Sequence, residues 1–193
     1  MKLSILIPVF NEKKTIKKII LKVLSIKHLK KEIIIIDDYS SDGSREIIKK
    51  MNSNQIKKKI FHSKNLGKGA AIKSGLRFIS GDVVIIQDAD LEYDPTDYKK
   101  ILSPLFDGRA DVVFGSRFLG DGEKRVLYFW HRVGNFILTL LSNSLSNLNL
   151  TDMEVGYKAF KTKILKEIKL NENRFGFEPE ITAKIAKKKT KNF

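Results

Sequence analysis

Two uninterrupted runs of branched aliphatic residues constrain the fold of this chain more than any other feature. Residues 33–36 are four isoleucines, and residues 83–86 read Val-Val-Ile-Ile. Branched side chains favour strands, and a strand without polar alternation is covered on both faces, as in parallel sheets flanked by helices. We therefore expect both runs to form central strands of a parallel sheet.

Strand-like and helix-like segments alternate along the first 114 residues. Helical segments carry apolar residues at a spacing of three and four, and Pro95 suits the first turn of a helix. This alternation predicts one α/β domain with a mostly parallel central sheet flanked by helices on both faces. The expected strands are residues 2–9, 32–37, 59–62, 82–87 and 111–114, and the expected helices are 15–24, 42–51, 68–79 and 95–106.

The pattern changes after residue 115. Residues 125–150 form a long amphipathic segment whose polar interruptions exclude a membrane span, which leaves packing in the core or lying on a membrane surface. Residues 151–161 look irregular to strand-like, and 178–188 read as a last helix. We see no repeat or linker and expect a single domain over residues 1–193.

Composition excludes several classes of site. The absence of cysteine excludes disulfides, thiolate zinc sites and cysteine nucleophiles. Three scattered histidines argue against a multi-histidine metal site. With 37 Lys and Arg against 22 Asp and Glu, the net charge of +15 suits nucleic acid, an anionic membrane or phosphorylated substrates, unless it reflects only a compositional bias. No signal peptide or span is evident, so we expect a cytoplasmic protein.

Acidic residues follow the two central strands. Asp37 and Asp38 end one strand, and Asp88 and Asp90 follow the other. Ligands of open parallel sheets bind beyond the carboxyl ends of the strands, so we expect a ligand or metal role for both pairs rather than simple turn formation. Asp88 and Asp90, two residues apart in an extended segment, project the same way, and their oxygens suit Mg²⁺ or Mn²⁺.

A glycine-rich segment and two arginines are candidates for phosphate contacts. The segment NLGKGAAIKSG, residues 65–75, has neither the P-loop nor the dinucleotide spacing, so its glycines are expected to permit a tight loop and close helix packing. Its Lys68 is a candidate for a nucleotide phosphate. Arg117 and Arg132 carry the planar fork that pairs with phosphate.

Eight motifs in order resemble the family 2 glycosyltransferases of the GT-A fold, and within them the polyprenyl-phosphate sugar transferases. The motifs are SILIPVFNE, IIIIDDYSSDGS, NLGKGAAIKSG, QDADLEYDP, VVFGSRF, HRVGN, LTDMEVGYKAF and ENRFGFEPEITAKIA. The likeness spans nearly the whole chain and implies a Rossmann-like sheet that binds a nucleoside diphosphate sugar. The family usually continues beyond the last motif, so the resemblance implies that the usual C-terminal extension is lacking.

The resemblance also implies roles for individual residues. Asp38 would read the base, Asp90 would hold the metal with Asp88 and Glu92 beside it, and Tyr39 replaces a common glycine. The residues implied for the nucleotide-sugar pocket are Pro8, Phe10, Asn11, Glu12, Asp38, Lys68, Asp88, Ala89 and Asp90. Those implied for phosphate clamping and the acceptor side are Arg117, Arg132 and Asp152, with Glu154 and Lys158 as further candidates.

The implied reaction is an inverting transfer of mannose or glucose from GDP-mannose or UDP-glucose to a polyprenyl phosphate, with Mg²⁺ or Mn²⁺ as cofactor. The enzyme would sit peripherally on the inner membrane face, held by lysines such as Lys184, Lys187, Lys188, Lys189 and Lys191, and a membrane-protein partner is left open. The alternatives are a soluble or glycan acceptor in cell-envelope synthesis, or a truncated, nucleotide-binding but inactive form. No nucleic-acid recognition motif is present, so nucleic acid is not an expected partner.

Overall fold

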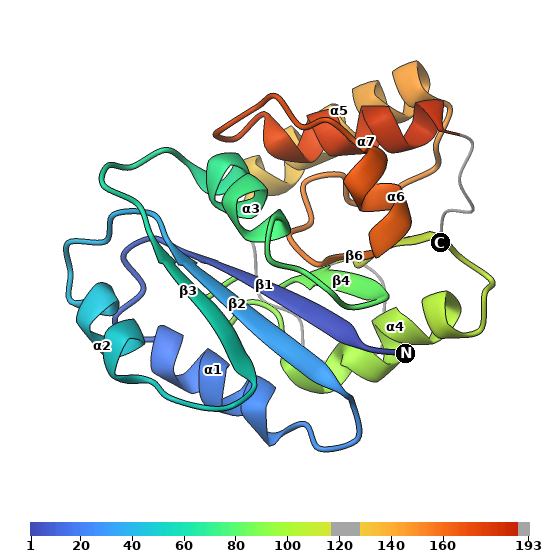
Figure 1. Ribbon diagram of the computed structural model, residues 1–193. Coiled ribbons are helices and arrows are strands. Elements are labelled where there is room, and N and C mark those ends of the chain that lie inside the picture. Colours follow the sequence, from blue (N-terminus) through green and yellow to red (C-terminus); the bar gives the residue numbers. More distant parts are fainter. Residues whose placement is uncertain (117–127, 189–193) are drawn as a thin grey trace.

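A computed structural model describes residues 1–116 and 128–188, and over these residues it contains one six-stranded sheet (Figure 1). The strand order is β3-β2-β1-β4-β6-β5. The strands are β1 (Leu3–Val9), β2 (Lys31–Asp37), β3 (Ile56–Phe61), β4 (Val83–Ile86), β5 (Val112–Phe114) and β6 (Lys158–Lys161).

The predicted parallel sheet is confirmed. β1 pairs in parallel with β2 and β4, and β2 pairs in parallel with β3. β6 is antiparallel to both β4 and β5. The sequence suggested only an irregular to strand-like segment here, because β6 has four residues and two of them are lysines. β3 also begins three residues before its expected start at residue 59.

Helices cover both faces of this sheet, as predicted (Figure 1). α1, α2 and α4 lie on one face, and α3, α6 and α7 lie on the other. A 3₁₀ turn, Pro95–Asp97, precedes α4, and α6 was not expected from the sequence. The helices are α1 (Ile16–Ser25), α2 (Ser44–Lys50), α3 (Lys68–Leu76), α4 (Tyr98–Phe106), α5 (Phe129–Ser146), α6 (Thr162–Glu167) and α7 (Phe177–Lys187).

The four isoleucines of β2 divide between two apolar layers. Ile33 and Ile35 pack with α1, α2 and α4, whereas Ile34 and Ile36 pack with α3, α6 and α7. All four are fully buried. This is the arrangement that an apolar run without alternation predicts, and it places the carboxyl ends of β1, β2 and β4 at one edge of the sheet.

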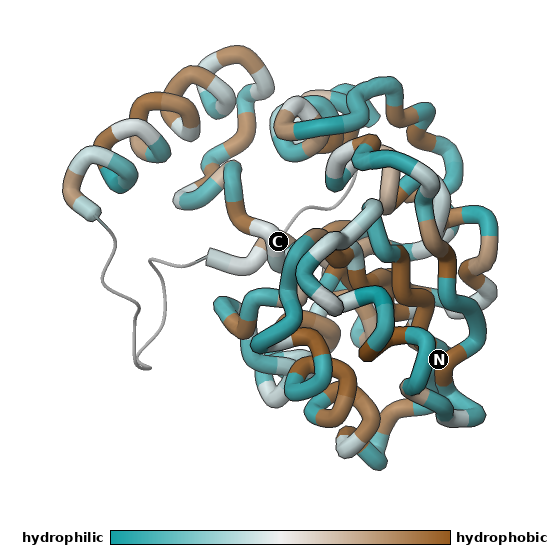
Figure 2. The backbone as a smooth tube through the Cα atoms, turned by 90° about the vertical axis from the view of Figure 1, so that its left-hand side faces the viewer, coloured by the Kyte–Doolittle hydropathy of each residue, from teal (hydrophilic) through white to brown (hydrophobic). Residues whose placement is uncertain are grey.

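The long helix α5 is mostly exposed, and it stands at the edge of the molecule (Figure 2). Within α5, whose residues are all described, only Thr139 is buried, so the core-packing interpretation is wrong for most of the helix. The helix contacts α7. Its exposed apolar side chains include Phe129, Trp130, Phe136, Ile137, Leu138, Leu140, Leu141 and Leu145. None of the helices in the described part of the chain is long and apolar enough to cross a membrane.

One buried carboxylate joins several elements at the opposite edge of the sheet from these carboxyl ends. Glu32 of β2 accepts hydrogen bonds from Ser4 Oγ of β1 (2.7 Å) and from Ser80 N and Oγ (2.5 and 2.7 Å), and it pairs with Lys2 and with Lys57 of β3. Burial alone would raise the pKa of Glu32, but these hydrogen bonds from Lys2, Ser4 and Ser80 lower it to about 2.

We expect Glu32→Gln to lower the free energy of unfolding at pH 7 by about 2–3 kcal/mol. Because the folded pKa lies below the ordinary value of 4.5, this stabilisation is complete above that value and is lost as the pH falls toward 2. Urea unfolding between pH 7 and pH 2.5 tests this, and the variant should lose less stability on acidification than the wild type. Glu46→Gln, the same change at an exposed position of α2, should shift stability by less than about 0.5 kcal/mol. Equal acid sensitivity of wild type and Glu32→Gln would contradict the assignment.

Candidate active site at the carboxyl edge of the sheet

The carboxyl ends of β1, β2 and β4 and the start of α3 surround a cleft of about 550 Å³. Backbone hydrogen bonds fix these ends together, with Asp38 N donating to Val9 O and Gln87 N donating to Leu6 O. Eight of the predicted pocket residues line the cleft together with residues from a distant segment. The lining residues are Pro8, Val9, Phe10, Glu12, Asp38, Asn65, Gly67, Lys68, Ala71, Asp88, Ala89, Asp90, Arg174 and Phe175.

A buried glutamine shapes the turn that bears the two aspartates after β4. Gln87 Nε2 donates to the carbonyl oxygens of Asp88 and Tyr93, both at 3.0 Å, and Gln87 Oε1 accepts from Tyr98 Oη at 3.0 Å. Asp90 Oδ1 accepts from the backbone N–H of Glu92 at 3.0 Å. Asp90 is exposed and Asp88 is half-buried, so this turn holds both carboxylates where they line the same cleft.

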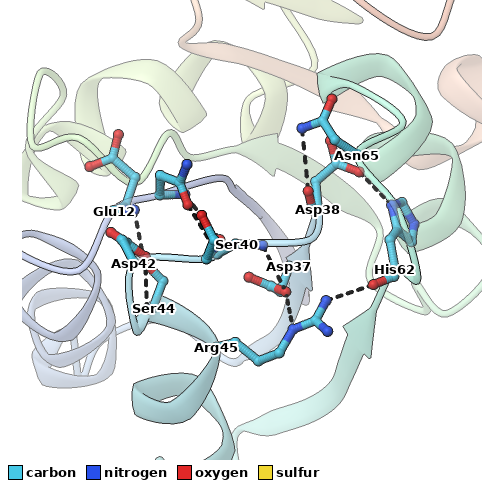
Figure 3. Close-up of polar contacts among 11 residues, drawn as sticks. Glu12, Asp37, Asp38, Ser40, Asp42, Ser44, Arg45, His62 and Asn65 are labelled. Carbon is cyan, nitrogen blue, oxygen red and sulfur yellow. Dashed lines mark hydrogen bonds and ion pairs between the residues drawn. The ribbon is translucent and has the colours of Figure 1, made fainter.

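Asp38 holds the glycine-rich loop against the end of β2 (Figure 3). Its carboxylate accepts hydrogen bonds from Leu66 N (2.9 Å) and Gly67 N (2.7 Å), and His62 Nδ1 lies 2.7 Å from Oδ1. Asn65 Nδ2 donates to the backbone oxygen of Asp38. Asp38 therefore lines the cleft with most of its hydrogen-bonding capacity already used by the protein.

The structure separates Asp38 from its neighbour and corrects the expectation of a ligand role for Asp37. Asp37 is fully buried, and its Oδ2 accepts from Arg45 Nε at 2.6 Å (Figure 3). Arg45 Nη2 also donates to the carbonyl oxygen of His62 at 2.6 Å. This ion pair anchors α2 to the sheet. Asp37 and Asp38 have different partners because consecutive residues of a strand point to opposite faces.

The glycines of residues 65–75 have the packing roles that the sequence predicts. Gly67 has φ +96°, and a Cβ added there would lie 2.4 Å from Asn173 O. A Cβ on Gly69 would lie 2.5 Å from Glu172 O. A Cβ on Gly75 would lie 2.8 Å from Ile36 Cδ1. The first two permit close approach of residues 172–174, and the third brings α3 against the sheet.

Lys68, the first residue of α3, lies between two carboxylates. Its Nζ is 2.9 Å from Asp88 Oδ1, 3.0 Å from Asp88 Oδ2 and 3.0 Å from Glu178 Oε1. Burial alone would lower the pKa of Lys68, but the charges of Asp88 and Glu178 raise it above its ordinary value. Lys68 is therefore a cation at neutral pH. Glu178, in the first turn of α7, was not among the predicted site residues.

The predicted acceptor residues lie beside the cleft rather than in its lining. Asp152 is buried, and its Oδ1 accepts from Asn135 Nδ2 of α5 at 3.1 Å. Gly156, four residues later, lies against Asp88, since a Cβ there would lie 1.9 Å from Asp88 Oδ2. Lys158 is buried and donates to the carbonyl oxygens of Met153 and Val155. Burial lowers the pKa of Lys158 to about 8.

The remaining predicted residues lie elsewhere. Asn11, with φ 56°, accepts from Ser41 N and is not in the cleft lining. Arg132 is exposed on α5, and neither it nor Glu92 lines the cleft. Arg117 lies outside the described residues, as do Lys189 and Lys191 of the proposed lysine cluster. Of the other lysines in that cluster, Lys184 pairs with Glu180 and Lys188 pairs with Glu167.

Arg174 and Phe175 line the cleft and were missed by sequence reasoning. They belong to the motif ENRFGFEPE, which lies about 100 residues from the rest of the cleft along the chain. The one local feature that could have marked these residues as candidates is a cation and an aromatic residue just before an acidic helix start. Nothing in the sequence alone indicated that this segment would reach the ends of β1 and β4.

The carboxylates of Asp88 and Asp90 fit a small divalent cation. Among the described residues no three His, Asp or Glu side chains gather as a metal site. Mg²⁺, however, is commonly bound through one or two carboxylates together with substrate phosphates and water. Two oxygen-donor side chains lining one cleft therefore match the binding mode of a cation that arrives with a diphosphate.

Comparison with known proteins identifies relatives along most of the chain. Residues 4–169 match the model of the family described as glycosyl transferase family 2. The chain is 26% identical over 193 residues to dolichol-phosphate mannosyltransferase from Pyrococcus furiosus, covering 95% of this chain and 53% of that protein. It is 29% identical over 203 residues to UDP-N-acetylglucosamine–dolichyl-phosphate N-acetylglucosaminyltransferase from Methanococcus voltae, covering 97% and 80%.

The fold is also similar to a solved structure. Glucosyl-3-phosphoglycerate synthase from Mycobacterium tuberculosis, crystallised with Mn²⁺, uridine diphosphate and glucosyl-3-phosphoglycerate, superposes with a TM-score of 0.69 at 21% identity. The match covers 92% of this chain and 62% of the synthase. The likeness confirms the predicted GT-A fold. Like the mannosyltransferase, the synthase is considerably longer than this chain.

We expect Gly156→Ala to displace Asp88 and to destabilise the protein by about 1–3 kcal/mol, because the added methyl group overlaps the carboxylate. Thermal unfolding measures the effect. Gly134→Ala is the matched control, since a Cβ on this α5 residue meets no described atom within 4 Å. The double variant Gly156→Ala with Asp88→Ala should recover part of the loss, because it removes the overlapping oxygens. If the loss of stability in the double variant equals the sum of the losses in Gly156→Ala and Asp88→Ala alone, these two residues are not in contact.

Proposed function

Because the chain belongs to glycosyl transferase family 2, we propose that it transfers a hexosyl group from a nucleoside diphosphate sugar to a polyprenyl phosphate. The observation that carries the proposal is the cleft at the carboxyl ends of β1, β2 and β4. It combines a lining surface for a nucleotide with two carboxylates and a cation on one wall. Ligands of such sheets bind at this position.

The donor would bind along the cleft. Pro8, Phe10 and Glu12 form the wall contributed by β1 and the residues after it, where the half-exposed Phe10 offers a flat apolar surface to a base. Asp38 accepts three contacts from the protein and keeps one carboxylate lone-pair site for a base N–H. Arg174, which is far from the other lining residues in the sequence, adds a guanidinium to the same cleft.

The transfer needs charge placement more than proton transfer. Asp88 and Asp90 would hold a divalent cation, which when bound neutralises charge on the departing diphosphate. The acceptor phosphate is anionic at neutral pH, so its oxygen would attack the anomeric carbon of the sugar without a general base while the nucleoside diphosphate leaves. Positioning and electrostatics would therefore supply most of the rate enhancement. Asp152 accepts a hydrogen bond from Asn135 of α5. It would then help to position the acceptor and would not act as a general base.

A lipid acceptor is supported by α5 and by the named relatives. Two relatives are named for transfer to dolichol or dolichyl phosphate. α5 exposes a series of large apolar side chains, and through Asn135 it contacts the segment that reaches Asp88. A helix of this kind suits the interface of a bilayer, and the +15 charge of the chain favours an anionic one.

We expect GDP or UDP, and the corresponding mannose or glucose conjugate, to raise the melting temperature more in the presence of Mg²⁺ or Mn²⁺ than in its absence. Asp90→Asn should weaken this binding at least about tenfold, because it removes a charged oxygen ligand of the cation. Asp97→Asn, a change at a carboxylate paired with Lys100 outside the cleft, is the control. A melting temperature indifferent to every nucleotide with metal would refute the donor assignment.

Incubation of radiolabelled donor with polyprenyl phosphate should place the label in the organic phase after extraction. Label appearing only in a water-soluble product would instead identify a soluble or glycan acceptor. Asp152→Asn should raise the KM for the lipid more than it lowers kcat. Loss of a basic limb from the pH–rate profile in this variant would show that Asp152 acts as a base.

We expect the protein to co-sediment with vesicles containing anionic lipid and to dissociate as salt is added. The double variant Leu141→Ser with Leu145→Ser should reduce binding severalfold, since both side chains are at least half exposed on α5. Leu21→Ser, a change at a half-exposed leucine of α1 on the other side of the sheet, is the control. Equal loss in both variants would exclude α5 as the contact surface.

A further inference from the structure

The ammonium of Lys68 uses the carboxylate that the proposed divalent cation would need. Both oxygens of Asp88 lie within 3.0 Å of Lys68 Nζ, and Glu178 Oε1 lies at the same distance on another side. A lysine ammonium has three donors and no fixed plane, so it satisfies these three oxygens together. An ion that binds Asp88 must therefore compete with a cation that belongs to the protein.

The two carboxylates around Lys68 differ in how they face the cleft. Asp88 and Lys68 both line the cleft, with side chains 18% and 30% exposed. Glu178 is 8% exposed, is absent from the lining and lies in the first turn of α7. A carboxylate at the start of a helix is stabilised there by the helix dipole. Glu178 is thus a buried, fixed partner, whereas Asp88 is the partner that a ligand can reach.

We propose that Lys68 is a resident counter-cation that exchanges partners when the donor binds. Before binding, its ammonium neutralises Asp88. When the donor diphosphate enters with its divalent cation, the ammonium leaves Asp88, keeps its contact with Glu178 and turns toward the diphosphate. Lys68 is a positioning residue in this scheme, and Glu178 is the pivot. The inference rests on the proposed function, because the exchange requires a diphosphate in the cleft.

The exchange couples the two ligands. A divalent cation alone meets Asp88 already paired and binds weakly, whereas a diphosphate gives Lys68 a new partner and releases Asp88. By linkage, each ligand must then raise the affinity for the other by the same factor. Removing the ammonium should strengthen binding of the metal alone, weaken binding of the nucleotide alone and reduce the coupling between them.

We would titrate the protein with Mn²⁺ at pH 7 and follow free Mn²⁺ by its electron paramagnetic resonance signal, with and without GDP or UDP. Lys68→Met should bind Mn²⁺ alone up to about fivefold more tightly than the wild type, the factor expected for release of one partly exposed ion pair. Its affinity for the nucleotide in the absence of metal, measured by calorimetry, should fall. Lys68→Arg, which keeps the charge, should leave the affinity for Mn²⁺ alone as weak as in the wild type.

Lys73→Met is the matched control for a general change of electrostatic field. It removes the same charge from the same helix, where Lys73 Nζ donates to Asn171 O and Asn173 Oδ1 rather than to a carboxylate. This variant should leave the affinity for Mn²⁺ alone unchanged within about twofold, and circular dichroism melts establish that each variant is folded. Should Lys68→Met not fold, Lys68→Gln provides the same test.

Two results would overturn the exchange. One is an affinity for Mn²⁺ alone that is the same in wild type and Lys68→Met, or is raised equally by Lys73→Met. The other is a wild-type affinity for Mn²⁺ that does not increase when GDP or UDP is present. In either case, nucleotide binding that requires Asp90 would leave the proposed function intact. Absence of nucleotide binding in wild type and all variants, with either metal, would refute the proposed function itself.

Discussion

Burial of both faces of β1, β2 and β4 is the constraint on which the rest of this structure depends. Side chains along these strands must be almost entirely apolar, because helices cover them from either side. Charged groups are then confined to the strand ends. Glu32 marks one edge, and Asp38, Asp88 and Asp90 mark the other. The first edge joins strands to one another, and the second leaves carboxylates facing a cleft.

The sequence was sufficient to predict the parallel sheet and the acidic residues of the cleft, because both follow from patterns within single segments. The wall formed by Pro8, Phe10 and Glu12 was implied only by the family resemblance. Apolar runs located the strands, and the acids after them located the cleft. Asp37 and Asp38 were not distinguishable in this way, since adjacent residues differ only in the face to which they point. Their partners, Arg45 and the loop after His62, come from separate parts of the chain.

Contacts between distant segments account for what the sequence did not reveal. β6 is short and contains two lysines, so its antiparallel pairing with β4 and β5 has no local signal. Arg174 reaches the cleft and Glu178 reaches Lys68 because Gly67 and Gly69 let residues 172–174 approach the start of α3. The charge of +15 was equally uninformative by itself, because the acids that define the cleft are a small and specifically placed minority.

The close approach at Gly67 and Gly69 also has a consequence for the order in which the molecule matures. The backbone N–H of Ala70 donates to Asn173 O, a residue about 100 positions later in the chain. During synthesis, β1 to β4 and their helices can collapse while residues 172–178 are still inside the ribosome. Until those residues emerge, Lys68 can form its ion pair with Asp88 but not its ion pair with Glu178. A chain stopped near residue 170 would lack both Arg174 of the cleft and the α7 side chains that complete one apolar layer of the core.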